Sequence, residues 1–397
     1  MASPTPSAPS PSAPSVDTLD LQQEIVRLQA LLETSRQVHS TIRLDEVLPT
    51  ILRIIVRELE LPGALSTEPR ITFGEMPTEP WEGCFRFPLD DKNGHRLTEI
   101  VVATPDCRAL TIYEEDFLER LALQASVAVE NARYYERSVA WARVEQDLHA
   151  ARAIQRSLVP QQMPEIDGYS VAVRYSACYE VGGDCVDIVS LPDGVQVMAV
   201  ADVAGKGLAS AIVSTAFRSA FRASVGAGLP LAELVSRLNQ QHCAEGDETR
   251  RRYVTGIFLK LDPKTHRLEV VNAGHNPGFL LRPDQAAHEL KCSATPIGIL
   301  PFVEYSSEFA DFPPGSRLLF YTDGLTEVFQ GDEEFGSERL LASFQQCAAP
   351  ESAAILDTLW QELRRFSGNE SQEDDMTALA LVRMTAAQDR LTGETVR

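Results

Sequence analysis

Two short runs of mostly apolar residues, 186–191 and 195–203, lie near the middle of the chain and are separated by Pro192-Asp193-Gly194. Glycine accepts the left-handed backbone conformation at the third position of a three-residue loop, so this tripeptide predicts a β-hairpin. A loop centred on Asp193 sets Asp184 opposite Asp202. The hairpin therefore predicts that the Cβ atoms of these two aspartates lie within about 5.5 Å of each other.

Both faces of the predicted hairpin are apolar, because the side chains of a strand alternate between its faces. One face carries the two aspartates with Val186, Ile188, Met198 and Val200. The other face carries Cys185, Val189, Val197, Ala199 and Ala201. Such a sheet must be covered on both sides, by helices, by a second sheet or by one of each. Asp187 has the wrong parity to share a face with Asp184, and the sequence offers no role for it.

Like charges that face each other across a hairpin are unfavourable unless a cation lies between them. Carboxylate oxygens suit Mg²⁺ or Mn²⁺ better than zinc. A single acidic residue here would be interpreted as a solvated strand end. Two aspartates in register, each beside glycines that allow close approach of the backbone, favour a metal site instead.

The N-terminal part predicts a tail, a small mixed domain and a long helix. Residues 1–16 are almost entirely Ala, Ser and Pro, which predicts a disordered tail. Helical periodicity follows over residues 17–39 and 45–60. Strand-like runs cover residues 70–73, 84–89 and 97–103. A stretch without Gly or Pro then runs from about residue 113 to residue 158, which predicts one long helix.

Residues 116–158 of this helix exceed the usual length of a globular helix and are predicted to form a coiled-coil linker. The alternative is a helix that packs on its own domain, but its charged flanks favour a paired helix. The predicted seam consists of Phe117, Leu121, Ala125, Ala128, Ala132, Tyr135, Val139, Ala142, Leu148 and Ile154.

The C-terminal part mixes helices and strands. Helical patterns cover residues 204–224, 231–243 and 351–366. Strand patterns cover residues 253–261, 268–273, 279–282, 317–323 and 376–384. Asp323 ends one of these strands, and the acidic pair Asp374 and Asp375 directly precedes another. These acids meet if the two strands are antiparallel neighbours.

Composition narrows the class of protein. The formal net charge of −21 over 397 residues argues against a nucleic-acid binder, because no basic stripe is available to neutralise phosphates. The seven cysteines form no CxxC pair, which is typical of reduced thiols in a cytoplasmic protein. No run of about 18 uncharged apolar residues exists, so we expect no membrane span.

Residues 30–135 resemble a GAF sensor domain. The matching stretches are residues 35–48, Phe87-Pro-Leu89 and residues 121–133. Only about ten residues separate the second helix from the first predicted strand, where the family usually has an extra hairpin. The resemblance therefore implies a shortened GAF-like domain over residues 17–135, with a dimerisation role favoured over ligand sensing.

Seven motifs in order resemble the metal-dependent Ser/Thr protein phosphatases (the PPM group, protein phosphatase 2C-like), in the SpoIIE/RsbU branch. They are Ile154-Gln-Arg-Ser-Leu-Val-Pro160, Glu180-Val-Gly-Gly-Asp184, Asp202-Val-Ala-Gly-Lys-Gly207, Asn272-Ala-Gly-His-Asn-Pro277, Tyr321-Thr-Asp-Gly-Leu-Thr-Glu327, Phe335-Gly336 with Glu338-Arg339-Leu340, and Asp374-Asp-Met-Thr377. The resemblance implies an α+β chain whose residues 159–385 form an α-β-β-α sandwich of two antiparallel sheets flanked by helices. Residues 386–397 are left as a tail.

The same resemblance implies the roles of the acids. Asp202 is expected to bridge two Mn²⁺ or Mg²⁺ ions, with Asp323 and Asp374 completing the first ion. The Val203 carbonyl is expected to serve the second ion, and Asp184 to hold that ion and its waters. Asp375 is the alternative to Asp374. Lys206 and His275 are candidate substrate-binding residues, although a solvated lysine and a structural loop histidine are the plainer interpretations.

These expectations describe a cytoplasmic, homodimeric phosphoserine/phosphothreonine phosphatase that its GAF-like module regulates through the linker helix. The resemblance implies a phosphorylated anti-sigma-factor antagonist as substrate. Two cations would activate a water for attack on phosphorus. One rival hypothesis is a pseudophosphatase that sequesters its partner, which the four intact aspartates argue against. A second rival is a ligand-binding protein whose C-terminal domain is only a reporter.

Overall fold

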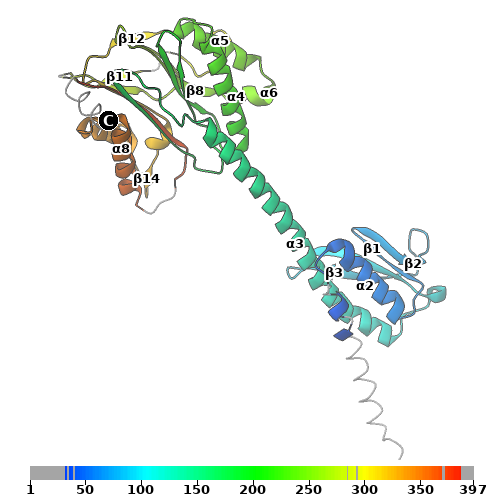
Figure 1. Cartoon of the computed structure of the whole chain (residues 1–397). Helices are drawn as coiled ribbons and strands as arrows, with labels where there is room; N and C mark the ends of the chain where they lie inside the picture. The colour runs from blue at the N-terminus through cyan, green and yellow to red at the C-terminus, as the bar shows by residue number, and fades with distance from the viewer. Residues whose placement is uncertain are drawn as a thin grey trace, which may run out of the picture. The chain divides into compact units, whose positions relative to one another are not determined.

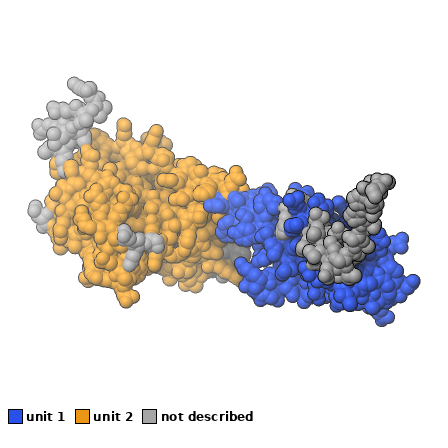
Figure 2. All heavy atoms as spheres, turned by 90° about the horizontal axis from the view of Figure 1, so that it is seen from below, with its two compact units in different colours: residues 1–145 blue, residues 146–397 orange. Residues whose placement is uncertain are grey.

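A computed structural model describes residues 32–33, 35–38, 41–283, 285–291, 294–368 and 372–385. The chain divides into two compact units, residues 1–145 and residues 146–397 (Figure 2). Helix α3 (Ile112–Leu158) contains the boundary between them. Both predicted tails lie outside the described residues, as does most of the helix predicted over residues 17–39.

The N-terminal unit is a four-stranded antiparallel sheet with helices α2 (Leu44–Glu58) and α3. Its strand order is β2-β1-β4-β3. The strands are β1 (Gly63–Thr67), β2 (Arg70–Gly74), β3 (Phe85–Asp90) and β4 (Arg96–Ala103), and a short 3₁₀ helix, η1 (Pro105–Cys107), precedes α3. The first strand was predicted at residues 70–73, but β1 precedes it and forms a hairpin with β2. Its sequence, Gly-Ala-Leu-Ser-Thr, lacks alternation because four of its five residues are buried.

The first part of α3 packs on its own domain. Five of the ten predicted seam residues lie in the hydrophobic core of the N-terminal unit: Phe117, Leu121, Ala125, Ala128 and Ala132. The seam predicted over these positions is therefore corrected, since a buried side chain is not available to a second helix. Further along α3, Tyr135 and Val139 are exposed.

The C-terminal unit contains two five-stranded antiparallel sheets with orders β11-β10-β13-β16-β5 and β12-β9-β8-β7-β6. The strands of the first sheet are β5 (Tyr169–Ser176), β10 (Gly278–Leu281), β11 (His288–Leu290), β13 (Arg317–Tyr321) and β16 (Met376–Arg383). Those of the second are β6 (Cys185–Ser190), β7 (Gln196–Val203), β8 (Val254–Asp262), β9 (Arg267–Ala273) and β12 (Glu308–Asp311). The strands β14 (Phe329–Gln330) and β15 (Glu333–Glu334) pair with each other.

Helices cover the outer faces of the two sheets (Figure 1). The helices α4 (Leu208–Val225) and α5 (Leu231–Ala244) pack on the second sheet, and the short α6 (Asp247–Arg250) follows them. On the first sheet lies α8 (Ser352–Ser367), against which α7 (Gly336–Gln346) packs. The unit is thus the α-β-β-α sandwich that the resemblance implied. No helix in the described part of the chain is long and apolar enough to cross a membrane.

The hairpin β6–β7 has the predicted register, with Val186 opposite Val200 and Cys185 opposite Ala201. Its parity is also confirmed, because Val186 and Val200 lie in the core between the sheets. Cys185 and Ala201 lie in the separate core beneath α4 and α5. Each face of the hairpin therefore packs into a different core.

Asp187 lies on the helix-covered side of the hairpin and is fully buried. Arg222 of α4 donates two hydrogen bonds to its carboxylate, at 2.5 and 2.6 Å. Arg218, one turn earlier, approaches the same carboxylate at 3.3 Å. Asp187 thus ties α4 to the sheet, which is the role that the sequence did not reveal.

Candidate metal centre

The aspartates predicted as ligands meet at one end of the two sheets. Asp202 lies in β7, and Asp184 directly precedes β6. Asp323 begins the 3₁₀ helix η2 (Asp323–Leu325) after β13, and Asp374 lies just before β16. Strands β13 and β16 are antiparallel neighbours, so the end of β13 lies beside the start of β16. This is the pairing under which Asp323 and Asp374 were predicted to meet.

Asp184 joins the two sheets at this end. Its carboxylate accepts a hydrogen bond from the hydroxyl of Thr322 at 2.8 Å and another from the hydroxyl of Thr377 at 2.5 Å. Neither threonine was predicted to have a role, although Thr322 directly precedes Asp323 and Thr377 is the last residue of the motif that begins at Asp374.

Burial and mutual repulsion define the electrostatics of the cluster. Burial, with the charges of Asp323 and Asp374, raises the pKa of Asp202 to about 7. Burial and then Asp202 raise the pKa of Asp184 well above its ordinary value. Burial is also the main cause of the raised pKa of Asp323 and of Asp375. These carboxylates lie in one another's field, and a bound cation would relieve that repulsion.

Asp374 and Asp375 have different surroundings. The Asp375 carboxylate is buried and accepts hydrogen bonds from the backbone amides of Cys178, at 2.8 Å, and Gly183, at 2.6 Å. Asp374 is partly exposed and forms an ion pair with Lys206 at 2.9 Å. Asp375 is thus occupied in holding the Gly183 backbone, which leaves Asp374 as the better candidate ligand of the two.

Gly183 leaves room for a group of oxygens. A Cβ atom on this residue would lie 2.9 Å from the Val203 carbonyl oxygen and 3.3 Å from the Asp202 carboxylate. The carbonyl oxygen of Gly205 would be 3.5 Å away. In the described part of the chain, no three acidic, histidine or cysteine side chains stand close enough to enclose an ion as they are. The all-oxygen donor set around this cradle nevertheless fits a hard divalent cation such as Mg²⁺ or Mn²⁺.

Lys206 and His275 differ in accessibility. About half of the Lys206 side chain is exposed, and its ammonium also donates to the Glu373 carbonyl at 2.7 Å. His275 is buried, with its ring nitrogens 2.8 Å from the Thr255 hydroxyl and 3.1 Å from the Tyr321 carbonyl. Burial lowers the pKa of His275 to about 4, so the ring is neutral at pH 7. This placement favours the structural interpretation of His275.

Gln155, near the end of α3, contacts the loop that carries Asp184. Its amide donates to the Gly182 carbonyl at 2.7 Å and accepts from the Gly182 amide at 3.0 Å. The next residue, Gly183, donates to Asp375. The sequence predicted no role for Gln155 beyond its place in a motif, because hydrophobic periodicity does not reveal which polar side chain contacts a distant loop.

A two-sheet sandwich with these acids at one end defines a phosphatase domain of the PP2C type. The SiaA-PP2C domain of Pseudomonas aeruginosa has the same fold, with a TM-score of 0.55 and 20% identity over 62% of this chain and 98% of that one. Residues 192–383 match the family model described as Stage II sporulation protein E (SpoIIE). The C-terminal part of this chain is therefore a SpoIIE-type, PP2C-like Ser/Thr protein phosphatase domain.

Two curated relatives are similar to the chain. Protein IcfG of Synechocystis is 26% identical over 60% of this chain and 41% of its own length. Phosphoserine phosphatase RsbP of Bacillus subtilis is 28% identical over 46% of this chain and 45% of its own length. The chain thus spans about half the length, or less, of these two relatives. None of these matches identifies the N-terminal unit, so its GAF-like character stays a prediction.

Magnesium and manganese occur in PP2C-type structures. RsbX was solved in complex with magnesium, and the catalytic domain of PstP with 2 manganese ions. Their TM-scores against this chain are 0.43 and 0.41.

Proposed function

We propose that the chain hydrolyses phosphoserine or phosphothreonine on a regulatory protein, with two Mn²⁺ or Mg²⁺ ions held by the acidic cluster. The observation that carries this proposal is the convergence of Asp184, Asp202, Asp323 and Asp374 at one end of the sandwich. Burial and neighbouring carboxylates raise the pKa of Asp184, Asp202 and Asp323, and such a cluster is costly to gather unless a cation joins it.

The cluster provides a separate role for each acid. Asp202 would bridge the two ions, with Asp323 and Asp374 on the first. The Val203 carbonyl and Asp184 would serve the second. When bound, such a pair of ions lowers the pKa of water and neutralises charge on the phosphoryl group, so no phosphoenzyme is required.

Neighbouring residues orient these groups. The hydroxyls of Thr322 and Thr377 fix the Asp184 carboxylate, and the buried Asp375 fixes the Gly183 backbone beside the cradle. The partly exposed ammonium of Lys206 lies at the edge of the cluster, beside Asp374, where it could contact a substrate phosphate.

The proposed substrate is a phosphorylated anti-sigma-factor antagonist, which the resemblance to the SpoIIE/RsbU branch suggests. The similarity to a protein named as a phosphoserine phosphatase supports the phosphoserine part of this proposal. We further propose that the protein works in the cytoplasm and that the GAF-like N-terminal unit regulates the phosphatase domain in a homodimer.

The pairing surface that we propose for the dimer is a stripe of α3 other than the seam first predicted. Val127, Tyr134 and Trp141 recur every seven residues, and their side chains are 47%, 76% and 72% exposed. Exposed apolar side chains that line up along one face of a helix provide a surface that a second chain can cover.

The test is phosphate release from a phosphoserine peptide and from p-nitrophenyl phosphate by the full chain, with Mn²⁺ and with EDTA. We expect release with Mn²⁺, its loss in EDTA, and a decrease of at least about a hundredfold in Asp202→Asn, because the bridging carboxylate serves both ions. Asp193→Asn is the matched control, since it makes the same change in the exposed turn of the same hairpin. Release that is insensitive to EDTA, or an Asp202→Asn variant as fast as wild type, would refute the proposal.

A further inference from the structure

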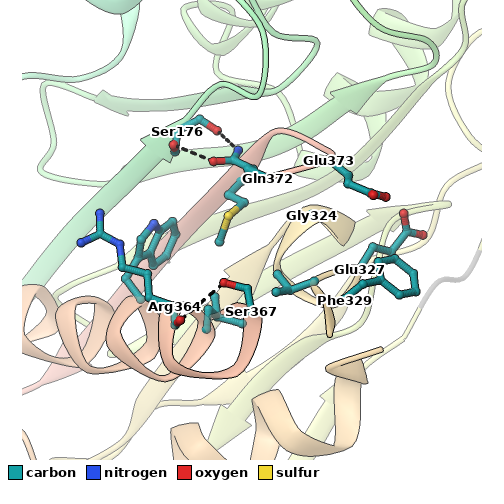
Figure 3. A pocket seen from close by; sticks show the side chains of 12 residues that line it. Ser176, Gly324, Glu327, Phe329, Arg364, Ser367, Gln372 and Glu373 are labelled. Carbon is teal, nitrogen blue, oxygen red and sulfur yellow. Dashed lines mark hydrogen bonds between the residues drawn. The ribbon is translucent and has the colours of Figure 1, made fainter. Parts of the chain in front are cut away.

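A cavity of about 210 Å³ lies next to the acidic cluster in the C-terminal unit (Figure 3). Its lining includes Gly324 and Glu373, which are the direct chain neighbours of Asp323 and Asp374. The cavity is therefore directly beside two of the acids, and a substrate bound at the acids could also reach into it.

One wall of the cavity is apolar and preformed. It contains Trp360 and Leu363 of α8 and Met376 of β16, and all three side chains are buried. The Gln372 side chain closes one edge, donating to the Ser176 carbonyl at 2.8 Å and accepting from the Ser176 hydroxyl at 3.1 Å. The sheet, the helix and this bridge hold the wall without any ligand.

The two sides of the cavity carry opposite charges. Glu327 and Glu373 line one side of the cavity, and Arg364 lines the opposite side (Figure 3). Both glutamates are exposed, and within the described residues neither forms an ion pair. The Lys206 ammonium also lies on the glutamate side, but it pairs with the Asp374 carboxylate and reaches Glu373 only at its backbone carbonyl. The proposed metal ions would balance Asp323 and Asp374, so the carboxylates of the two glutamates are the negative charge that remains for a guest. This side favours a cation.

We propose that the cavity binds a lysine or arginine side chain of the phosphoprotein substrate, located within three residues of the phosphorylated serine or threonine. This inference rests on the proposed function of the acidic cluster. An extended chain advances about 3.3 Å per residue, so a side chain at that separation reaches a cavity that begins beside the acids.

The chemistry of the two basic side chains matches that of the cavity. Their aliphatic stems pack on apolar surface while the charged head stays near water and acidic groups. The stem would lie on the wall of Trp360, Leu363 and Met376, and the head would donate hydrogen bonds to Glu327 and Glu373.

The experiment compares two phosphoserine peptides with the full chain and Mn²⁺, one with lysines within three residues of the phosphoserine and one with glutamines at the same positions. We expect kcat/KM to be about tenfold higher for the lysine peptide, the effect of one hydrogen bond to a charged group. In the double variant Glu327→Gln/Glu373→Gln this ratio should fall to near one. Both side chains are exposed, so the variant should fold.

Glu338→Gln is the control, because this exposed glutamate of α7 does not line the cavity. It should leave the ratio unchanged. Equal kcat/KM values for the two peptides, or a ratio that survives the double variant, would overturn the assignment of the cavity alone. Absence of phosphate release from both peptides and from p-nitrophenyl phosphate would instead overturn the proposed function, and this inference with it.

Discussion

At the scale of single residues, the phosphatase domain uses aspartate in two different ways. Asp187 meets its opposite charges within the protein, since Arg222 and Arg218 of α4 both approach its carboxylate. Asp202 has other carboxylates as its main charged neighbours, and burial together with their repulsion raises its pKa. The first arrangement is complete within the chain, whereas the second fits the cation site that we propose.

Removal of one partner from the Asp187 group should destabilise the C-terminal unit. Asp187 is fully buried, whereas the side chains of Arg218 and Arg222 are 16% and 45% exposed, so water can reach the guanidinium groups that lose this carboxylate. The cost is then that of the lost charged hydrogen bonds, typically about 1.5–3 kcal/mol. We therefore expect Asp187→Ala to lower the free energy of unfolding of this unit by about that amount in urea. Asp193→Ala, in the exposed turn, should change it by less than about 0.5 kcal/mol. A loss below about 1 kcal/mol in Asp187→Ala would mean that α4 is held by packing alone.

At the scale of elements, the sequence predicted best where a local pattern and a turn signal agree. The hairpin β6–β7 has the predicted register because the strand alternation and the Gly194 turn specify the same pairing. Strands β1 and β5 were not predicted, because neither shows a clear alternation of apolar and polar residues. Most of β1 is buried, and β5 lies at the edge of its sheet. The role of Asp187 was also beyond reach, because its partners lie 31 and 35 residues away on a helix.

The N-terminus of α3 is held by hydrogen bonds to the Glu114 carboxylate, so its stability should depend on pH. The Glu114 carboxylate accepts hydrogen bonds from the Thr111 amide, at 2.7 Å, and the Glu114 amide donates back to the Thr111 hydroxyl at 3.2 Å. This reciprocal pair is a capping box. Arg108 donates two more hydrogen bonds to Glu114, at 2.8 and 2.6 Å, and they are the main reason that its pKa falls to about 2.

A carboxylate whose pKa is lower in the folded state stabilises that state above its unfolded pKa, and the stabilisation disappears as the pH falls. For Glu114 the window runs from its ordinary value of 4.5 down to about 2. We expect the melting temperature of the N-terminal unit to fall across this window, and to fall less steeply in Glu114→Gln. Glu115→Gln, an exposed neighbour, should keep the wild-type slope. Identical slopes in all three proteins would show that the capping box does not contribute.

At the scale of the whole molecule, two units with separate cores share one long helix. The exposed stripe of Val127, Tyr134 and Trp141 belongs to the unit that no comparison identifies. Single exposed apolar side chains are common on monomers, but three that line up on one face of a helix form a surface that a second chain can cover.

The proposed dimer is tested by a charge placed in that stripe. Trp141→Glu puts a carboxylate where two apolar side chains would meet, so light scattering of the full chain should change from a dimer to a monomer. Arg143→Glu places a new charge on a different side of the same helix and should leave the dimer intact. A wild-type chain that is monomeric at all concentrations measured would remove the basis for this proposal.

The two-sided packing of β6 and β7 also has an evolutionary consequence. Alternate residues of these strands contact the opposite sheet, and the residues between them contact the helices α4 and α5 that cover their own sheet. Compensating substitutions should accordingly arise within one of these sets and seldom between them, since coupling between mutations is strongest for residues in contact. A lineage could thus remodel the helix-facing positions, and with them the packing of α4, while the spacing of Asp184 and Asp202 is inherited unchanged.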